Sequence, residues 1–531
     1  MRNTYKHVDI NTVILSRTPS AFPGFRNSLG EMAVLSSLPT LSPGNGFVHA
    51  LAAVAVVACT LLLRFIISYT RARLQFPGPP VKNFLVGNLD QTMTDDVHEK
   101  WIQWNREYGQ VFQTWNGLFS RVVYIGDPRL VAEIATQNWP KSASQYDGFK
   151  PLDGDALFVQ TNQERWKMQS KRLAPAFQPS VIQSQYPCLA RHIGNYVRQL
   201  DRAAETNSVV CLSELNILLS LDFIGDIAFG TSFNAINQGR DCRIAQLLEM
   251  ILPELMKCGL FPLRGKIPIF KKTRVMNSAI TELRNMAKDA VKDARRKDLT
   301  DIGKTKPDKK IFEILALQRE ADGNYTFNSQ ELCDNYVAFL VAGGDPTAHT
   351  MSFLVWQVLR NPTIFEQLRA EIDASIPFDA EAATLEHVKL PYLNMVLKET
   401  LRFSSPGFGT FRICKKDTTV AGVTLPANTT LALWNPAVHR DPRLWEDPDK
   451  FDPERWRSGQ PKLRGSYFPF SYGPRSCTGQ GLAMLEMTLT LATLFRRYDI
   501  TPEPGFELEY LPSFTLKPKN GFPIRVTRRK C

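Results

Sequence analysis

The residues best placed to do chemistry form one short segment, Phe470-Ser-Tyr-Gly-Pro-Arg-Ser-Cys-Thr-Gly479, which runs into an amphipathic stretch beginning at Gln480. Cys477 stands just before this predicted helix, and a helix N-terminus and a nearby cation both favour thiolate over thiol. Gly473 permits a tight turn, and Gly479 lets the backbone approach a large flat group. A thiolate presented in this way suits an axial position on iron. The alternative is a buried structural cysteine beside a turn.

The segment matches the signature Phe-x-x-Gly-x-Arg-x-Cys-x-Gly at every fixed position, and the chain therefore resembles the cytochrome P-450 superfamily of haem-thiolate enzymes. The resemblance extends over residues 75–525. It implies haem b as the cofactor and Cys477 as the thiolate ligand of its iron. It also implies that Phe470, Gly473, Arg475 and Gly479 contribute to the cofactor site.

Haem carries two propionates, and a buried pocket needs cations or donors for them. The resemblance assigns this role to Arg475 and to Arg412. A third partner in the family comes from Trp-x-x-x-Arg, but Trp166-Lys-Met-Gln-Ser170 has serine at the arginine position. We expect the indole of Trp166 to remain a donor. Either Lys171 or Arg172 substitutes for the missing arginine, or this propionate is held less tightly.

Glu399-Thr-Leu-Arg402 places an acid and a base on one helical face. Such a pair is usually a surface salt bridge worth a few tenths of a kcal/mol. In the family, however, an arginine that Arg455 matches joins the pair in a buried network that supports the haem loop. We therefore expect these three side chains to have a structural role and no part in proton transfer.

The segment Ala342-Gly-Gly-Asp-Pro-Thr347 departs from the family pattern Ala-Gly-x-Asp/Glu-Thr-Thr, whose distorted helix opens a groove for dioxygen. In the family the acid and the first Thr organise water for proton delivery. Asp345 matches the acid, but Pro346 replaces the first Thr; it kinks a helix and cannot relay a proton. We predict Asp345 and Thr347 as the catalytic side chains, with Thr347 about 100° further round an ideal helix. A lone His349 is expected to be a surface or packing residue.

Helical periodicity dominates from residue 160 to 403, and strand-like runs occur at 110–126 and 408–434. Residues 295–310 are predicted to form a charged linker. The pattern indicates one mainly α domain with a minor β region, and the resemblance makes this the cytochrome P-450 fold.

Two helix starts are marked by capping residues. Asn328 followed by Glu331 predicts a capping box at the start of the helix that carries Asp345. Asn361 is predicted as the N-cap of the next helix, with Pro362 at the first helical position.

The composition excludes several other classes. Hydrophobic residues make up 44% of the 531 residues and charged residues 22%, as in ordinary globular proteins. The nine cysteines show no Cys-x-x-Cys pair, which argues against a disulfide framework or zinc site and favours a reducing compartment. The net charge of +12 is concentrated between residues 264 and 310, with few aromatics and no nucleic-acid motif, so we expect a solvated surface and no nucleic-acid partner.

An apolar segment at residues 47–69 predicts a transmembrane anchor. Twenty-three helical residues span about 35 Å, enough for a hydrocarbon core of about 30 Å. Basic residues follow the segment, which places the rest of the chain on the cytoplasmic side. A cleaved signal peptide is disfavoured because the run is long and lies far from the N-terminus.

Four parts are thus predicted. Residues 1–46 are an N-terminal extension of unknown role, 47–69 the anchor, 70–82 a basic, proline-rich hinge, and 83–531 the haem-thiolate catalytic domain. The resemblance implies a single-pass protein of the endoplasmic reticulum membrane with a cytoplasmic catalytic domain.

The resemblance implies a monooxygenase that inserts one atom of O2 into a lipophilic substrate. Because the chain has no Gly-x-Gly-x-x-Gly nucleotide motif, electrons are expected from NADPH through a separate NADPH-cytochrome P-450 reductase, with cytochrome b5 as a further donor. The family's substrate-contacting segments hold six phenylalanines, which favour a bulky apolar guest: Phe149, Phe158, Phe339, Phe408, Phe411 and Phe514. The motif set resembles that of fungal members of the family, and by analogy this resemblance implies a role in secondary-metabolite biosynthesis, such as that of terpenoids.

Two other classes stay open. A haem-thiolate isomerase or peroxide-using enzyme does not need the relay Thr that Pro346 replaces, although the retained Asp345 argues against it. A non-catalytic haem-binding protein is the third class, and it would show no spectral response to organic ligands.

Overall fold

The computed structural model describes residues 46–530 except 84, 118–119, 262–263, 266, 268, 301–309, 379, 460 and 462. The chain divides into two units, residues 1–72 and 73–531, which we describe separately. The predicted N-terminal extension at residues 1–46 lies outside the described residues except for Gly46.

The first unit contains α1 (Gly46–Arg73) except for its last residue. Within it, Ala50–Arg73 is the one segment of the described chain that is long and apolar enough to cross a membrane, with a mean hydropathy of 2.5 over its most apolar window. The helix continues four residues past the predicted end of the anchor at residue 69, so the start of the predicted hinge is helical. Only with Pro77–Pro80 does the sequence become incompatible with a helix.

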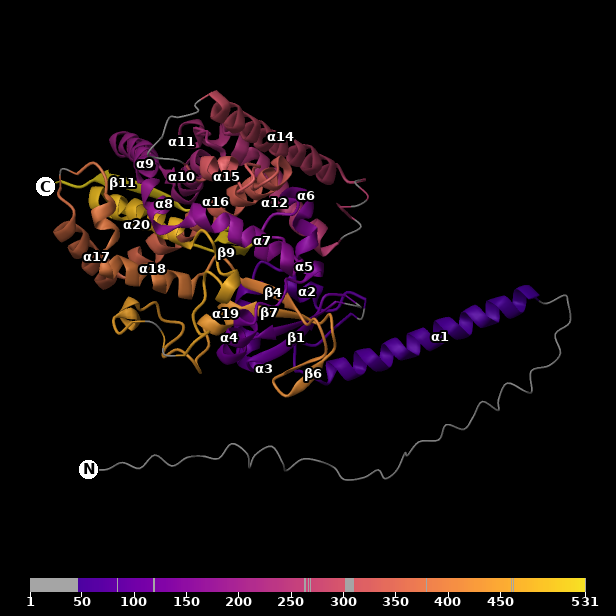
Figure 1. Ribbon diagram of the computed structural model, residues 1–531. Coiled ribbons are helices and arrows are strands. Elements are labelled where there is room, and N and C mark those ends of the chain that lie inside the picture. Colours follow the sequence, from indigo (N-terminus) through magenta and orange to yellow (C-terminus); the bar gives the residue numbers. More distant parts are fainter. Residues whose placement is uncertain are drawn as a thin grey trace, which may run out of the picture. The chain divides into compact units, whose positions relative to one another are not determined.

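The second unit is mainly helical with small sheets, as predicted (Figure 1). Its longer helices are α3 (Val97–Tyr108), α4 (Pro128–Thr136), α7 (Gln163–Leu173), α9 (Tyr186–Thr206), α10 (Leu212–Phe229), α12 (Arg243–Leu260), α14 (Lys271–Thr300), α16 (Ser329–Leu359), α17 (Pro362–Ser375), α18 (Pro391–Phe403) and α20 (Gln480–Arg497). The shorter ones are α2 (Leu89–Thr92), α5 (Ala143–Tyr146), α6 (Lys150–Asp153), α8 (Pro179–Ser184), α11 (Ala235–Gln238), α15 (Ile311–Leu317) and α19 (Asn435–His439).

Both predicted strand segments contain strands. β1 (Val111–Trp115), β2 (Arg121–Ile125), β7 (Thr430–Trp434) and β4 (Gly409–Ile413) form one sheet in that order, in which only β2 and β7 run parallel. A hairpin joins β5 (Thr418–Val420) to β6 (Val423–Leu425). Outside both segments lie β3 (Val210–Cys211), β8 (Tyr498–Pro502), β9 (Tyr510–Pro512), β10 (Leu516–Pro518) and β11 (Pro523–Arg528), which pair as β3-β11-β8 and β9-β10.

Both predicted helix starts are confirmed, although only one N-cap side chain makes a capping hydrogen bond. Asn328 Oδ1 accepts a hydrogen bond from Glu331 N at 2.9 Å, and Asn328 N donates one to Glu331 Oε2 at 3.0 Å, which is the predicted capping box. Asn361 is the N-cap of α17 and Pro362 its first residue, as predicted, although the Asn361 amide donates to the Gln357 carbonyl at 2.7 Å and makes no capping bond. The predicted linker at 295–310 is wrong in its first part, since α14 continues to Thr300; residues 301–309 lie outside the described part.

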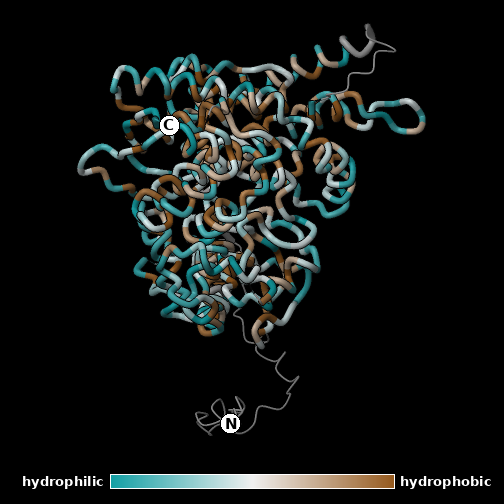
Figure 2. Tube along the Cα trace, turned by 90° about the vertical axis from the view of Figure 1, so that its left-hand side faces the viewer, coloured by the Kyte–Doolittle hydropathy of each residue, from teal (hydrophilic) through white to brown (hydrophobic). Residues whose placement is uncertain are grey.

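The core is built around α10 and α16, which pack closely (Figure 1). A Cβ at Gly343 would lie 2.8 Å from Ile224 Cδ1, so a larger residue there would require the Ile224 side chain to shift. Hydrophobic segments gather inside the unit in Figure 2. Helix α16 is unbroken through Pro346, which places the residues of the predicted groove on the central helix of the fold.

A buried network surrounds Glu399. Its carboxylate accepts hydrogen bonds from Arg402 Nη2 and Nε at 2.8 and 2.9 Å, from Arg455 Nε at 3.0 Å and from Trp456 Nε1 at 2.9 Å. The side chains of Glu399 and Arg402 are fully buried. The predicted contacts between Glu399, Arg402 and Arg455 are therefore present in the structure.

The same network reaches the segment that carries Cys477. Arg402 Nη1 donates to the His439 carbonyl at 2.8 Å, and the His439 ring accepts a hydrogen bond from Phe468 N at 3.0 Å. Burial, with the nearby Arg402 charge, lowers the pKa of His439 to about 3, so its ring stays neutral and can accept this bond. The network thereby fixes the chain just before Phe470.

Replacing Glu399 by Gln should destabilise the fold, because the buried Arg402 and the partly buried Arg455 lose their counter-charge. Breaking one partner of such a pair costs about 3–5 kcal/mol, and a lower midpoint of denaturant unfolding should report it. Glu454→Gln is the matched control, since Glu454 makes an exposed pair with Arg457. Equal midpoints for the two variants would contradict the assignment.

Candidate active site

The Cys477 loop is constrained at both ends. Cys477 N donates to the Phe470 carbonyl at 2.8 Å, which closes the loop. Gly473 has a φ of +73°, and a Cβ there would lie 2.6 Å from the Ala135 carbonyl oxygen, so this turn requires glycine. Gly479 is the N-cap of α20. The sulfur is thus presented at the start of a helix, as predicted.

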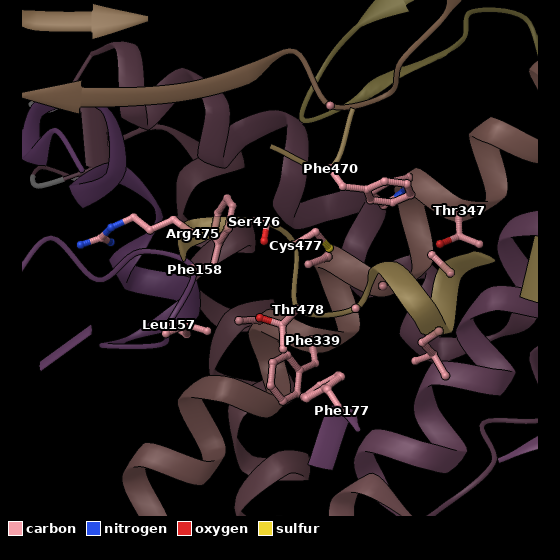
Figure 3. A pocket seen from close by; sticks show the side chains of 18 of the residues that line it. Leu157, Phe158, Phe177, Phe339, Thr347, Phe470, Arg475, Ser476, Cys477 and Thr478 are labelled. Carbon is pink, nitrogen blue, oxygen red and sulfur yellow. The ribbon is translucent and has the colours of Figure 1, made fainter. Parts of the chain in front are cut away.

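The electrostatics of Cys477 differ from the prediction. Burial raises the pKa of the thiol, and backbone hydrogen bonds from Gly479 and Gln480 only partly oppose this. Arg475 does not assist, because it extends away from Cys477 (Figure 3). The predicted help from a nearby cation is therefore wrong. The free thiol is neutral at neutral pH, and a bound metal ion is what would deprotonate it.

Cys477 lies inside the protein, but its side chain opens onto a cavity of about 350 Å³ (Figure 3). The predicted site residues Phe470, Arg475, Gly479, Trp166 and Thr347 line the same cavity. Gly473, Arg412 and Asp345 do not. The loop, the central helix and the region around α7 therefore converge on one space.

The cavity wall is mainly apolar and aromatic. Phe158 and Phe339 line it as predicted, and Phe177 joins them (Figure 3). Phe149 and Phe514 lie behind the wall, where each packs its ring against Phe158.

Phe408 and Phe411 do not reach the cavity, contrary to the prediction. They pack against Trp434 with ring centroids 5.8 Å away in each case. Both belong to the hydrophobic cluster between α3 and the sheet. The sequence did not show which face of β4, and of the residue before it, is turned toward the cavity.

Cations gather at one edge of the cavity. Arg475 Nε donates to Asn138 Oδ1 at 2.8 Å, and its guanidinium lies 4.1 Å from the ring centre of Trp166. Lys141 Nζ bonds to the Phe158 carbonyl and lies 4.3 Å from the Tyr146 ring centre. Lys141 lies just before α5, Tyr146 lies on α5, and Arg475 belongs to the Cys477 segment.

Among the described residues no carboxylate forms an ion pair with these cations, although the buried Asp153 partly offsets the charge of Lys141. Burial, followed by the charges of Arg412 and Arg475, holds the pKa of Lys141 well below its usual value. Burial lowers the pKa of Arg412, and burial with the Arg412 charge lowers that of Arg475 to about 10. Arg475 Nη2 and Arg412 Nε are buried without a hydrogen-bond partner. A site with surplus positive charge and unused donors fits an anionic group, as the haem propionates would supply.

Lys141 was missed by the sequence analysis, and the expected substitutes are wrong. Lys171 is exposed, and Arg172 pairs with Glu320 at 3.5 Å; neither lines the cavity. Ser170 lines it as an uncharged side chain. Lys141 stands outside the Trp-x-x-x-Arg pattern, and its backbone pairs with that of Arg412, a residue distant in the sequence.

Across the cavity, Thr347 faces the Cys477 side (Figure 3). The Thr350 hydroxyl donates to the Pro346 carbonyl at 2.8 Å, and both residues line the cavity. The central helix thus presents two hydroxyl side chains to the cavity, close to Pro346, which replaces the first Thr of the family pattern.

Asp345 points elsewhere. Its Oδ1 lies 3.1 Å from His349 Nε2, and its Oδ2 accepts a hydrogen bond from Thr515. Burial alone would raise the pKa of Asp345, but the His349 charge and the two hydrogen bonds lower it overall. His349 is buried, as expected of a packing residue.

The loop cysteine, the apolar cavity and the cationic edge together define a haem-thiolate protein. The family model described as cytochrome P450 matches residues 77–524. The chain belongs to the cytochrome P450 family, which makes it a haem-thiolate oxidoreductase whose cofactor is haem with an axial cysteine thiolate.

Individual relatives agree. The chain is 28% identical over 528 residues to thromboxane-A synthase of Sus scrofa, covering 90% of this chain and 97% of that protein. It is 25% identical over 468 residues to cytochrome P450 3A5 of Homo sapiens, covering 86% and 92%. The crystal structure of the cytochrome P450DA heme domain has the same fold, with a TM-score of 0.76 at 23% identity, and covers 86% of this chain and 98% of its own.

Cys477→Ser should bind haem weakly and lose the strongly red-shifted absorption band of the reduced carbon monoxide adduct, because a hydroxyl is a poor substitute for a thiolate ligand. Cys211→Ser is the control, since Cys211 lies outside the cavity and should leave the band unchanged. An unchanged band in the Cys477 variant would contradict the ligand assignment.

Lys141→Met should weaken haem retention about tenfold, the loss expected for one hydrogen bond to a charged group. Competition for haem with an acceptor globin measures it. Lys171→Met should retain haem as the wild type does. The reverse ranking of these two variants would restore the role first expected for Lys171.

Proposed function

We propose that the chain is a membrane-anchored monooxygenase that inserts one oxygen atom of O2 into a bulky lipophilic substrate. The supporting observation is the cavity itself. Cys477 and Thr347 both line it, and aromatic side chains form much of its wall. Haem bound there supplies the activation of dioxygen. The apolar wall favours a terpenoid or a similar secondary metabolite as the substrate.

The proposal gives each predicted residue a task. Cys477 is the iron ligand, and Phe470 and the two loop glycines hold its position. Arg475 and Arg412, together with Lys141, bind the propionates, while Trp166 packs against the guanidinium of Arg475.

On the opposite side, Thr347 offers a hydroxyl to oxygen and water in the cavity. We assign Asp345 an indirect part in proton delivery. Its two carboxylate oxygens already interact with His349 and Thr515, so it does not contact the cavity directly.

We further propose that electrons come from NADPH through NADPH-cytochrome P450 reductase, with cytochrome b5 as an additional donor, at the endoplasmic reticulum membrane. Helix α1 is long and apolar enough for a single crossing, and the basic residues after it favour a cytoplasmic catalytic unit. No nucleic-acid partner is proposed.

A haem-thiolate isomerase or peroxide-using enzyme is the second candidate. Pro346 favours it, because such an enzyme does not need the hydroxyl that proline removes. One of the relatives above is also a synthase by name.

Turnover of lipophilic substrates should require NADPH, the reductase and dioxygen together, and products should carry label from 18O2. The full chain in reductase-containing membranes, offered a panel of terpenoids, is the assay. Turnover of an organic peroxide without NADPH or reductase, and none with them, would establish the second candidate instead.

A further inference from the structure

Outside the haem cavity, three side chains that commonly bind metal ions lie close together between two helices. Cys188 and His192 are four residues apart on α9, which puts them on one face of the helix. Asp226 comes from α10, which packs against α9. The thiol sulfur, one imidazole nitrogen and one carboxylate oxygen all lie within 4.8 Å of one another. Among the described residues no other three such side chains form a comparable group.

The three side chains are largely removed from solvent. The side chain of His192 is 1% exposed and that of Asp226 3%, while Cys188 is half-buried. His192 Nε2 lies 3.1 Å from Asp226 Oδ2, and the other ring nitrogen, Nδ1, has no hydrogen-bond partner among the described residues. The imidazole is thus held at one nitrogen only. Polar side chains are costly to bury, so such a group needs an explanation beyond packing.

The three donor types match Zn²⁺. Sulfur, imidazole nitrogen and carboxylate oxygen all bind this ion, and sites with three protein ligands keep water at the fourth position. Donors of a tetrahedral zinc site stand about 3.4–3.8 Å apart, so side chains within 4.8 Å of one another need to approach by at most about 1 Å. The absence of Cys-x-x-Cys pairs argues against zinc held by paired cysteines. It does not bear on a site built from one cysteine, one histidine and one carboxylate.

Two cations already share the Asp226 carboxylate. Arg191 donates to Oδ2 and Lys310 to Oδ1, and Arg191 Nη2 also donates to Cys188 Sγ at 3.7 Å. One carboxylate thus faces two positive side chains. Both cations are long and partly exposed, Arg191 by 58% and Lys310 by 30%, so their charged ends can turn outward into water.

The charges balance when a zinc ion takes the place of these two cations. Burial, followed by the Asp226 charge, raises the pKa of Cys188 to about 12, so the sulfur is a neutral thiol before an ion binds. As Zn²⁺ binds, the S–H bond of Cys188 breaks and its proton leaves to solvent. One thiolate and one carboxylate then neutralise the two charges of the ion.

We propose that Cys188, His192 and Asp226 form a binding site for Zn²⁺ that joins α9 to α10, with water as the fourth ligand. Arg191 and Lys310 compete with the ion for the carboxylate and move away when it binds. None of the three ligands lines the haem cavity. The inference therefore does not depend on the proposed monooxygenase function.

The site nevertheless adjoins the cavity wall. Ile224, Ile227 and Ala228 lie on α10 to either side of Asp226 in the sequence, and all three line the cavity. An ion that ties Asp226 to α9 would hold the helix that carries this part of the wall.

The first experiment measures zinc binding and the type of ligand. The haem-loaded full chain, in which haem occupies Cys477, is dialysed against buffered Zn²⁺, and the bound metal is determined. One zinc ion per chain should remain bound, and X-ray absorption at the zinc edge should show one sulfur neighbour among nitrogen and oxygen neighbours. A chain that retains no stoichiometric zinc, or zinc without a sulfur neighbour, would overturn the proposal.

Variants of the ligands locate the site. Cys188→Ala should lose the sulfur neighbour and weaken zinc binding at least about 100-fold, the upper end of the loss caused by removing an outer partner of a metal ligand. His192→Gln should weaken binding to a similar degree. Cys211→Ser is the matched control, since Cys211 is also half-buried but lies outside the group, and it should bind zinc as the wild type does. Equal affinities for the Cys188 and Cys211 variants would overturn the proposal.

The competing cations distinguish a metal site from an ion-pair network. Arg191→Gln should tighten zinc binding about tenfold, because the ion no longer displaces a charged hydrogen bond from Asp226. Arg198→Gln removes the same charge at an exposed position about two turns further along α9 and should leave the affinity unchanged. Weaker binding in the Arg191 variant, or the same change in both variants, would overturn the proposal.

Thermal unfolding shows whether a variant that binds no zinc is still folded. Without zinc, Cys188→Ala should unfold at about the wild-type midpoint and retain the carbon monoxide band. Zinc should raise the midpoint of the wild type but not that of Cys188→Ala, because only the folded wild type offers all three ligands. An equal rise in both proteins would contradict the assignment of Cys188 as a ligand.

Discussion

The structure depends on a single buried negative charge, that of Glu399. Two arginines and a tryptophan donate hydrogen bonds to it, and Arg402 also donates one to the carbonyl of His439. Because His439 is neutral, its ring can accept the backbone N–H of Phe468. The loop that presents Cys477 is thus attached to the helical core through charge-assisted hydrogen bonds rather than through apolar packing alone, which fixes its direction.

The cavity is electrostatically divided. Lys141 and Arg475 line it with depressed pKa values, and the charge of Arg412 acts on both, whereas most of the remaining lining is apolar or aromatic. This division lets one space take a cofactor with anionic edges and an apolar guest together, because each part of the wall matches a different chemical surface.

Much of this arrangement could be predicted from the sequence, because short runs of neighbouring residues determine it. The signature around Cys477 predicted the family, and the capping box at Asn328 predicted the start of α16. The anchor was visible as a long apolar run. These features depend on residues that are neighbours in the chain.

The rest depends on contacts between distant segments. The backbone of Lys141 pairs with that of Arg412, and Arg475, which extends away from Cys477, donates to Asn138. Which phenylalanines face the cavity depends on strand register, so Phe408 and Phe411 were misplaced. The sulfur's pKa was predicted in the wrong direction because burial outweighs the helix terminus.

The cationic edge has a consequence for how much active protein a cell contains. Without an anion, Lys141, Arg412 and Arg475 repel one another in a poorly solvated space. A group that binds only the folded chain stabilises it by mass action. The supply of cofactor therefore controls not only the fraction of loaded enzyme but also the amount of chain that escapes quality-control proteolysis.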